Sequence, residues 1–367
     1  MKSAAAAIFL GTRALAEGVR ISAIGKVVSV AFGTGETLSI IIIATLTLFY
    51  TFEGGMRAVI WTDVLQFALY ITGSVAAFLL LLHKIPGGWP TVTQAAAAAG
   101  GKLTVFDFAF SLTKSYTFWS GLLGGTFLTM ASHGTDQTMV QRLLASRNER
   151  DSKTALLASG AIIFAQFALF LVLGVMLFVY AQHFALTIPG GDPDKLYPQF
   201  IVHSMPVGLA GIVLASIFAI AMSNASGSLN SLASSSIIDL AVRRGESGAQ
   251  SLVRSRKLTL VWGIVLGVLG LVQWGPVLVA GLTIASITYG ATLGVFLLGT
   301  WNRRANETGA LTGFTTGLAA MIAIKFLTPL AWTWYVLVGT VITFAVGSLA
   351  SMLTSSKRAN VVAPLTS

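Results

Sequence analysis

The chain has 367 residues, of which 55% are hydrophobic and only 10% are charged, and its mean hydropathy is +0.81. Because soluble domains carry about a quarter charged residues, this composition excludes an ordinary soluble protein and predicts a polytopic membrane protein. The net charge of +10 would indicate nucleic-acid binding only if the basic residues formed a patch on a soluble face, whereas here they lie between apolar runs. The absence of cysteine excludes disulfides and thiolate metal sites.

Apolar segments recur along the whole chain, and each can supply the roughly 20 residues that a helix needs to cross a bilayer. In chain order they are 3–32, 36–53, 57–82, 116–143, 154–181, 207–240, 257–274, 276–299, 308–327 and 330–354. The first is interrupted by Arg13, Glu17, Arg20 and Lys26, so it should either pack inside the protein or lie partly at the interface. We expect one transmembrane helical domain over residues 1–355 and a short cytoplasmic tail over 356–367.

The N-terminus allows a second interpretation. The apolar run from Ala4 to Gly11 and the small residues Ala14-Leu15-Ala16 resemble a signal peptide with its cleavage site. Arg13 lies between the run and the cleavage site, which argues against this interpretation. A start inside a longer protein fits the pattern better.

The basic residues predict the orientation. If the segments alternate sides, one set of connections carries most of the arginines, and the opposite set carries only Lys84, Lys102, Lys114, Lys195 and Lys325. The positive-inside rule therefore puts the C-terminus in the cytoplasm. We expect the protein to lie in the cell (inner) membrane. The two long connections, 83–115 and 182–207, are then outer loops, and a short surface helix is expected at Ala95–Ala99.

Polar residues inside the apolar segments are the candidates for function, because ionisable groups in a membrane usually mark an ion or substrate pathway. Asp63 lies about seven residues into its segment, roughly 10 Å deep. It either pairs with a loop arginine at the interface or contacts a transported cation. Near Gly134, the polar residues Asp136 and Gln137 indicate either a helix break facing a water-filled cavity or a helix that ends near Met130.

The segment 207–240 is the most informative. Between Ile220 and Ser231 it places six hydroxyl or amide side chains in an otherwise apolar helix. Small residues at such spacing form a tight packing face. Alternatively, Ser223 and Asn224 supply oxygen ligands to a dehydrated cation, because hard cations prefer oxygen.

Three motifs carry a family resemblance. They are Gly-Gly-x-x-Ala-Val-x-x-Thr-Asp-x-x-Gln at Gly54–Gln66, Gly-Thr-Asp-Gln-x-x-Val-Gln-Arg at Gly134–Arg142, and a Met-Ser-rich segment that closes on Ile237-Ile238-Asp239-Leu240. In this order, over about residues 1–355, the chain resembles the sodium/solute symporter family, which includes sodium-coupled sugar, proline, iodide and vitamin transporters.

The resemblance implies an all-α inverted-repeat transporter with two five-helix halves and with substrate and ion near the midplane. It implies sodium-coupled symport of a small organic solute, with Na⁺ as the coupling ion and no other cofactor. The sodium ligands would be the backbone carbonyl of Ile220 and the side chains of Ser223 and Asn224, and Asp63 would take part in cation binding or release. The partners would be the solute and the lipid bilayer, with no nucleic acid.

Two departures from the family pattern matter. The family usually carries Ser or Thr where this chain has Asn224, so sodium coordination is expected to be weaker or altered, although an amide oxygen can still serve as a ligand. The segment 3–32 resembles the third core helix, so the first two core helices would be absent. The alternative to a working symporter is therefore a truncated, non-transporting remnant.

The solute is less well specified. Sugar-carrying members have Gln-Glu-Tyr where this chain has Leu282-Thr283-Ile284, which disfavours a hexose. Ser286, Thr288 and Tyr289 are substrate-binding candidates, as are Asp136 and Gln137. No catalytic residue is expected, because the histidines fall beside separate segments and no glycine-rich phosphate loop follows a strand. A channel would need a repeated filter that one asymmetric chain does not offer.

Overall fold

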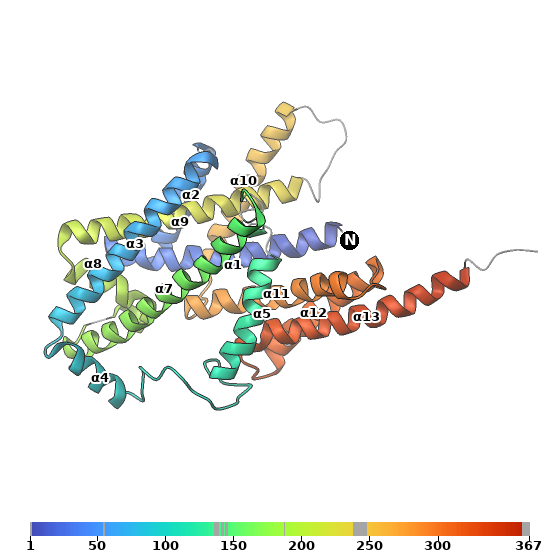
Figure 1. Cartoon of the computed structure of the whole chain (residues 1–367). Coiled ribbons are helices and arrows are strands. Elements are labelled where there is room, and N and C mark those ends of the chain that lie inside the picture. The colour runs from blue at the N-terminus through green and yellow to red at the C-terminus, as the bar shows by residue number, and fades with distance from the viewer. Residues whose placement is uncertain are drawn as a thin grey trace, which may run out of the picture. The chain divides into compact units, whose positions relative to one another are not determined.

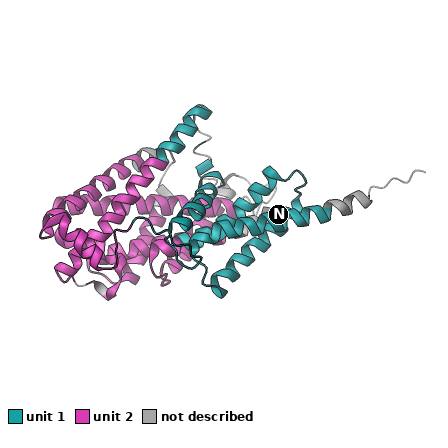
Figure 2. Cartoon of the chain, turned by 60° about the horizontal axis from the view of Figure 1, so that its bottom comes forward, with its two compact units in different colours: residues 1, 105–159, 282–367 teal, residues 2–104, 160–281 magenta. Residues whose placement is uncertain are grey.

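The computed structural model describes residues 2–53, 56–135, 139–140, 143, 146–186, 188–237 and 248–361, and every regular element among them is a helix (Figure 1). The chain divides into two compact units (Figure 2). Unit 1 contains residues 105–159 and 282–367 together with residue 1, and unit 2 contains residues 2–104 and 160–281.

Unit 2 holds the N-terminal helices and the serine-rich helix. Its elements are α1 (Lys2–Phe32), α2 (Glu36–Glu53), α3 (Met56–Lys84), α4 (Gly88–Ala98), most of α7 (Glu149–His183), the 3₁₀ turns η2 (Pro189–Gly191) and η3 (Pro193–Lys195), α8 (Leu196–Ser204), α9 (Val207–Ser235) and α10 (Gly248–Gly270). One buried cluster joins α3, α7, α8 and α9, and a second joins α1, α2, α9 and α10. The short helix expected at 95–99 is confirmed as the end of α4.

A sharp turn separates α1 from α2. Gly33 has a φ of +65°, a left-handed conformation that glycine adopts without strain. The two helices are bent by 113° across this break. Small residues then allow close approach, because a Cβ at Gly18 of α1 would lie 2.6 Å from Cβ of Leu269 on α10. The charged residues of α1 therefore belong to a helix that packs against other helices. This agrees with the expectation that segment 3–32 packs inside the protein.

Unit 1 holds the C-terminal helices. Its elements are the π-helical turn η1 (Ser120–Gly124), α5 (Gly125–Gly134), the start of α7, most of α11 (Val277–Trp301), α12 (Glu307–Leu327), the 3₁₀ turn η5 (Trp332–Trp334) and α13 (Tyr335–Val361). The helices α12 and α13 pack through glycines: a Cβ at Gly313 would lie 2.5 Å from the carbonyl oxygen of Thr343 and 2.9 Å from Cα of Gly347. The helix α13 continues past residue 355, where a tail was expected.

Several helix boundaries differ from the predicted segments. The helix α5 continues beyond Met130 to Gly134, where Thr135 closes it by donating from Oγ1 to the carbonyl of Ala131 at 2.7 Å. The helix α10 begins nine residues before position 257 and ends at Gly270, just before Gly275 and Pro276 break the chain. By length and composition, six helices of the described part can cross a membrane, or seven if α1 and α2 together count as one bent span.

Candidate functional site: the serine-rich helix and its neighbours

Two serine hydroxyl groups of the serine-rich helix α9 bond to the helix's own backbone. Ser216 donates to the carbonyl of Val213 at 2.8 Å and Ser231 donates to the carbonyl of Gly227 at 2.9 Å. Such a bond to the preceding turn lets a serine lie in an apolar helix, because the bonded hydroxyl keeps a partner in a low-dielectric environment.

The helix α9 has two different faces. Its buried face includes Ala221, Ala225, Ser228, Leu229 and Leu232 and packs in the clusters shared with α1. In the C-terminal half of the helix, from Ile220 onward, the exposed face is mostly polar and consists of Asn224, Gly227, Asn230, Ser231 and Ser234. Both hypotheses for the polar residues of this helix therefore find a place, because tight packing occurs on one face and oxygen-bearing side chains are presented on the other.

The predicted sodium ligands lie together on α9. The side chain of Asn224 is exposed, and its Nδ2 donates to the carbonyl oxygen of Ile220 at 3.0 Å. A carbonyl can only accept, so the amide must present its nitrogen here and keep Oδ1 as its remaining acceptor. Ser223 is half-buried beside it. The carbonyl oxygen of Ile220, which is one of the predicted sodium ligands, therefore already accepts a hydrogen bond from Asn224, one turn later in the helix.

The predicted cation contact on α3 is positioned by the packing of α3 against α9. These helices are antiparallel: a Cβ at Gly73 would lie 2.5 Å from Cγ2 of Val213, and Ala77 shares a buried cluster with Ala210. Asp63 lies ten residues before Gly73 on α3, and Ser223 lies ten residues after Val213 on α9. Because the helices are antiparallel, both steps lead in the same direction from the Gly73–Val213 contact, and each covers about 15 Å. The backbone of Asp63 is therefore level with Ser223, although its side chain lies outside the described part of the structure.

A buried carboxylate that the sequence did not single out as a site residue lies on α1. Glu17 is only 1% exposed and occupies one position of an apolar stripe with Leu10, Ala14 and Ile21. Its Oε2 accepts from Oγ of Ser228 on α9 at 2.7 Å and from Arg20 at 3.0 Å, whereas Oε1 has no partner among the described residues. Glu17 could have been identified from the sequence, because it is the one charged residue in a helical stripe at i, i+4, i+7 and i+11 that otherwise contains Leu10, Ala14 and Ile21.

A second group of charges encloses a cavity of about 420 Å³ within unit 2. Nζ of Lys26 on α1 lies 2.8 Å from Oδ2 of both Asp192 and Asp194, and Asp194 also accepts from the main-chain N–H of Val277 at 3.1 Å. Lys195 pairs with Glu36 at the start of α2. These contacts tie the 3₁₀ loop to three helices, so most of the charge lining the cavity is paired.

The pKa of Asp192 reflects this pairing. Burial raises the pKa, but the bond from Lys26, the main-chain N–H of Asp194 at 3.0 Å and the charges of Lys26 and Lys195 together outweigh burial. The pKa of Asp192 therefore lies below its ordinary value, and the carboxylate is ionised at neutral pH.

The predicted substrate residues belong to unit 1. Ser286 on α11 is 1% exposed, and Thr288 donates to the carbonyl of Ala285 at 3.0 Å. Tyr289 packs against a buried cluster of α5, α11 and α13. Asp136 and Gln137 lie outside the described residues. The three candidates therefore lie within a single turn of α11, with Ser286 buried and both Thr288 and Tyr289 half-buried.

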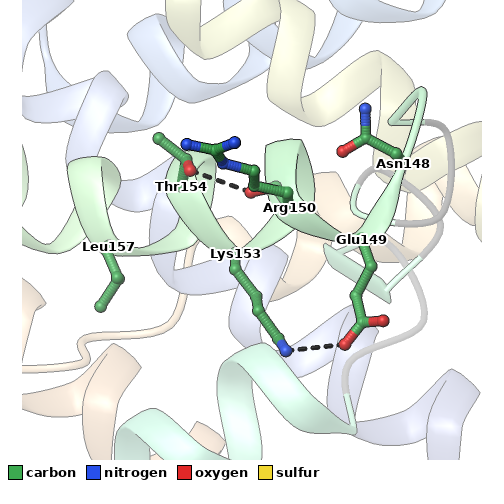
Figure 3. Close-up of a pocket in the computed structure, with 6 residues that line it drawn as sticks. All are labelled: Asn148, Glu149, Arg150, Lys153, Thr154 and Leu157. Carbon is green, nitrogen blue, oxygen red and sulfur yellow. Dashed lines mark hydrogen bonds and ion pairs between the residues drawn. The ribbon is translucent and has the colours of Figure 1, made fainter.

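A surface depression of about 620 Å³ lies at the start of α7 (Figure 3). Asn148 caps the helix by accepting from the main-chain N–H of Asp151 at 2.8 Å, and Glu149 pairs with Lys153 at 2.7 Å. These exposed groups are explained by helix capping and i,i+4 pairing. No group of three or more metal-ligating side chains of His, Asp or Glu occurs in the part of the chain that the structure describes.

Comparisons with known proteins agree on one family. The model of the sodium:solute symporter family matches residues 3–317. The sodium/sialic acid symporter of Proteus mirabilis is 28% identical over 329 residues, which are 88% of this chain and 66% of the relative. The human sodium/iodide cotransporter is 30% identical over 321 residues, which are 82% of this chain and 48% of the relative. The chain thus spans about half to two thirds of the length of these relatives.

A solved structure shares the fold. It shows a Na⁺-coupled sialic acid symporter in a substrate-bound, outward-open state, and it matches with a TM-score of 0.76 and 27% sequence identity over 94% of this chain and 74% of the other. The expected all-helical transporter fold is therefore confirmed.

Proposed function

The chain belongs to the sodium:solute symporter family, and from this premise we propose that it performs sodium-coupled symport of a small organic solute. It is an integral membrane protein, and the expectation that it is not an enzyme is confirmed by its membership of a family of transporters. The observation that carries the proposal is the polar face of α9, with Ser223 and Asn224 beside the carbonyl of Ile220.

We propose that Na⁺ is held by oxygens of this face. The hydroxyl of Ser223, Oδ1 of Asn224 and the carbonyl of Ile220 are hard oxygen ligands of the kind that small cations prefer. The amide nitrogen of Asn224 repels a cation, so sodium would be bound after the amide swings away from Ile220 and turns its oxygen toward the ion. This rearrangement replaces one hydrogen bond, which is a reason to expect a lower sodium affinity than with Ser or Thr at this position.

Asp63 would supply the negative charge. Its level along α3 matches that of Ser223, and an ionised carboxylate near a partly dehydrated cation offsets the desolvation of both. The function proposed for Asp63 is to attract the ion to the polar face of α9 and to release it toward the cytoplasm. The orientation proposed, with the C-terminus cytoplasmic in the cell (inner) membrane, is supported by the distribution of basic residues.

The solute would be bound by Ser286, Thr288 and Tyr289 of α11, with Asp136 and Gln137 as further candidates. Relatives are named for sialic acid, iodide and monocarboxylates. These three solutes are anions, so anions are the first solutes to test. A hexose remains disfavoured because Leu282-Thr283-Ile284 offers only one hydroxyl in the place of a Gln-Glu-Tyr group.

Uptake into proteoliposomes tests the proposal. The full-length product of the gene is reconstituted, and accumulation of a panel of labelled acids, halides and vitamins is measured under an inward gradient of sodium. The control replaces sodium by choline or potassium at the same ionic strength. Accumulation of at least one solute that requires sodium supports symport, and equal accumulation in all three salts would contradict it.

A further inference from the structure

The connection between α4 and η1 has an unusual distribution of apolar and charged side chains. Phe106, Phe108 and Phe110 are 61%, 64% and 66% exposed, whereas Asp107 between them is half-buried. A loop in water normally shows the opposite arrangement, with the charge outside and the rings covered. We call residues 105–119 the aromatic loop. All of them lie in unit 1.

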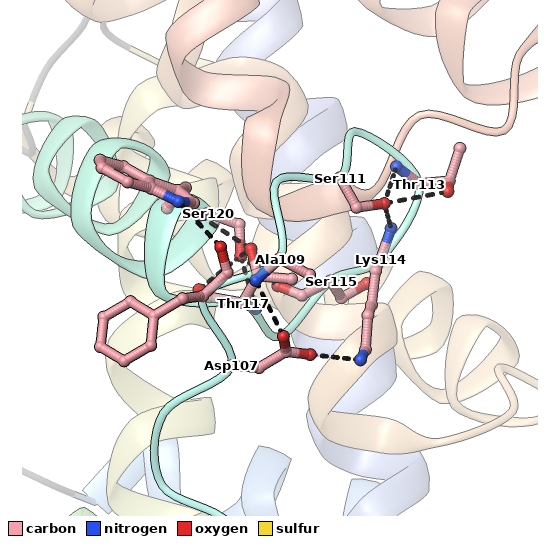
Figure 4. Close-up of polar contacts among 10 residues, drawn as sticks. Asp107, Ala109, Ser111, Thr113, Lys114, Ser115, Thr117 and Ser120 are labelled. Atoms are coloured by element: carbon pink, nitrogen blue, oxygen red, sulfur yellow. Dashed lines mark hydrogen bonds and ion pairs between the residues drawn. The ribbon is translucent and has the colours of Figure 1, made fainter.

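Internal polar contacts hold the aromatic loop in this conformation (Figure 4). Asp107 pairs with Lys114 and accepts from the main-chain N–H of Ala109 at 3.0 Å. Oγ of Ser111 accepts from the main-chain N–H groups of Thr113 at 3.2 Å and Lys114 at 3.0 Å. Because these polar groups are satisfied within the loop, the phenyl rings are turned outward by a defined structure.

The aromatic loop is attached to the beginning of an apolar span. The main-chain N–H of Ala331 donates to the carbonyl of Leu112 at 2.8 Å, and Nε1 of Trp334 donates to the carbonyl of Ser111 at 3.2 Å. The ring centroids of Phe110 and Trp334 are 5.9 Å apart. The segment Trp332–Thr354 is long and apolar enough to cross a membrane, so these contacts fix the loop at the level where that span begins.

The chemistry of this level is that of the lipid–water boundary. Beyond the hydrocarbon core, the headgroup layer on each side is about 5–8 Å thick. Trp and Tyr are enriched there because their rings are amphipathic, and Phe, like Trp and Leu, forms the apolar face of segments that lie at the boundary between headgroups and acyl chains. Trp332 and Tyr116, with ring centroids 6.4 Å apart, complete a group of aromatic residues at this end of the span.

We propose that the aromatic loop is a membrane-interface anchor, which seats Phe106, Phe108 and Phe110 in the headgroup layer beside the start of α13. The polar turn at Ser111–Lys114 then faces water. The occupant of the apolar surface is the lipid interface, because the loop is continuous with the end of a membrane span. The anchor would fix the depth of unit 1 in the bilayer, and it depends on the protein being in a membrane but not on which ion or solute it carries.

The test uses the absence of cysteine from the chain. Phe108→Cys and, as the matched control five residues away, Thr113→Cys are labelled with bimane and reconstituted in phosphatidylcholine vesicles. Quenching is measured with lipid nitroxides at the fifth and the twelfth acyl carbons and with aqueous iodide. At position 108 we expect the shallow nitroxide to quench at least about twice as strongly as the deep one, and at position 113 iodide should dominate.

Three results would overturn the proposal. Equal iodide quenching at both positions without lipid quenching would put the loop in water. Protection of position 108 from all quenchers would mean that protein covers it, either a second copy or another part of the chain. Stronger quenching by the deep nitroxide would put the ring in the hydrocarbon core. If Phe108→Cys does not elute as a single species, Phe106→Cys gives the same measurement.

Discussion

The side-chain amide of Asn224 donates a hydrogen bond to the main-chain carbonyl oxygen of Ile220 over 3.0 Å. This bond occupies one of the oxygens proposed for sodium and turns the amide nitrogen toward the place of the ion. The side chain of Asn224 and the proposed sodium ion therefore compete for the carbonyl oxygen of Ile220. Because of this competition, the sodium affinity should depend on the residue at position 224.

Replacement of Asn224 by Ser should strengthen sodium binding. A serine hydroxyl presents an oxygen in every rotamer, so no amide nitrogen has to leave the site first. If the gain is about 1 kcal/mol, the sodium concentration for half-maximal uptake should fall roughly fivefold. The measurement is the sodium dependence of solute uptake, and the control is Asn230→Ser on the same exposed face. A shift of equal size in both variants would contradict a specific role of Asn224.

Replacement of Ser223 by Ala should have the opposite effect. The loss of one oxygen ligand without change of the helix should raise the half-maximal sodium concentration about threefold to tenfold. Ser231→Ala is the matched control, because Ser231 is exposed on the same helix and donates to the carbonyl of Gly227. An unchanged sodium dependence in Ser223→Ala would favour a packing role for Ser223.

Asp63→Asn should weaken sodium-stimulated uptake while leaving the amount of protein in the membrane unchanged. The amide keeps the shape of the carboxylate but removes the charge that would attract the cation, so we expect a loss of at least about tenfold in uptake at low sodium. Surface-exposed Glu149→Gln controls for a general effect of net charge. Full uptake by Asp63→Asn would instead support a pair with a loop arginine.

The contact between Glu17 and Ser228 should be measurable as a coupling in stability. Ser228→Ala leaves a buried carboxylate with one bond fewer, which should cost about 1–3 kcal/mol and lower the melting temperature in detergent by several degrees. In the Glu17→Leu background, where the apolar stripe of α1 is complete, the same substitution should have little effect. Ser216→Ala is the control, because the Ser216 hydroxyl bonds to the carbonyl of Val213 in its own helix. Equal effects of Ser228→Ala in both backgrounds would exclude the coupling.

The lowered pKa of Asp192 predicts a loss of stability in acid. A carboxyl group with a folded-state pKa below its unfolded value of about 3.9 contributes stability above that value, and the contribution disappears as the pH falls through the folded pKa. The melting temperature of the protein should therefore fall more steeply below about pH 4 than that of Asp192→Asn, in which Lys26 retains Asp194. Parallel pH profiles would show that the Lys26–Asp192 pair contributes no stability.

The amino-acid sequence by itself determined the class of the protein and the positions of several of its helices. The segments 36–53 and 308–327 agree closely with α2 and α12, because a long apolar run between polar residues, glycines and prolines is a local signal for a membrane helix. The family followed from short motifs, and its match over residues 3–317 confirms that resemblance.

Only the tertiary structure decided which polar groups meet. The sequence marked Glu17 and Lys26 as interruptions of an apolar segment, but their partners Ser228, Asp192 and Asp194 lie more than 160 residues further along the chain. A buried charge must find a partner to offset its desolvation, yet nothing local in the sequence specifies which partner. That choice is made when helices distant in sequence pack side by side, which also separates the buried face of α9 from its polar one.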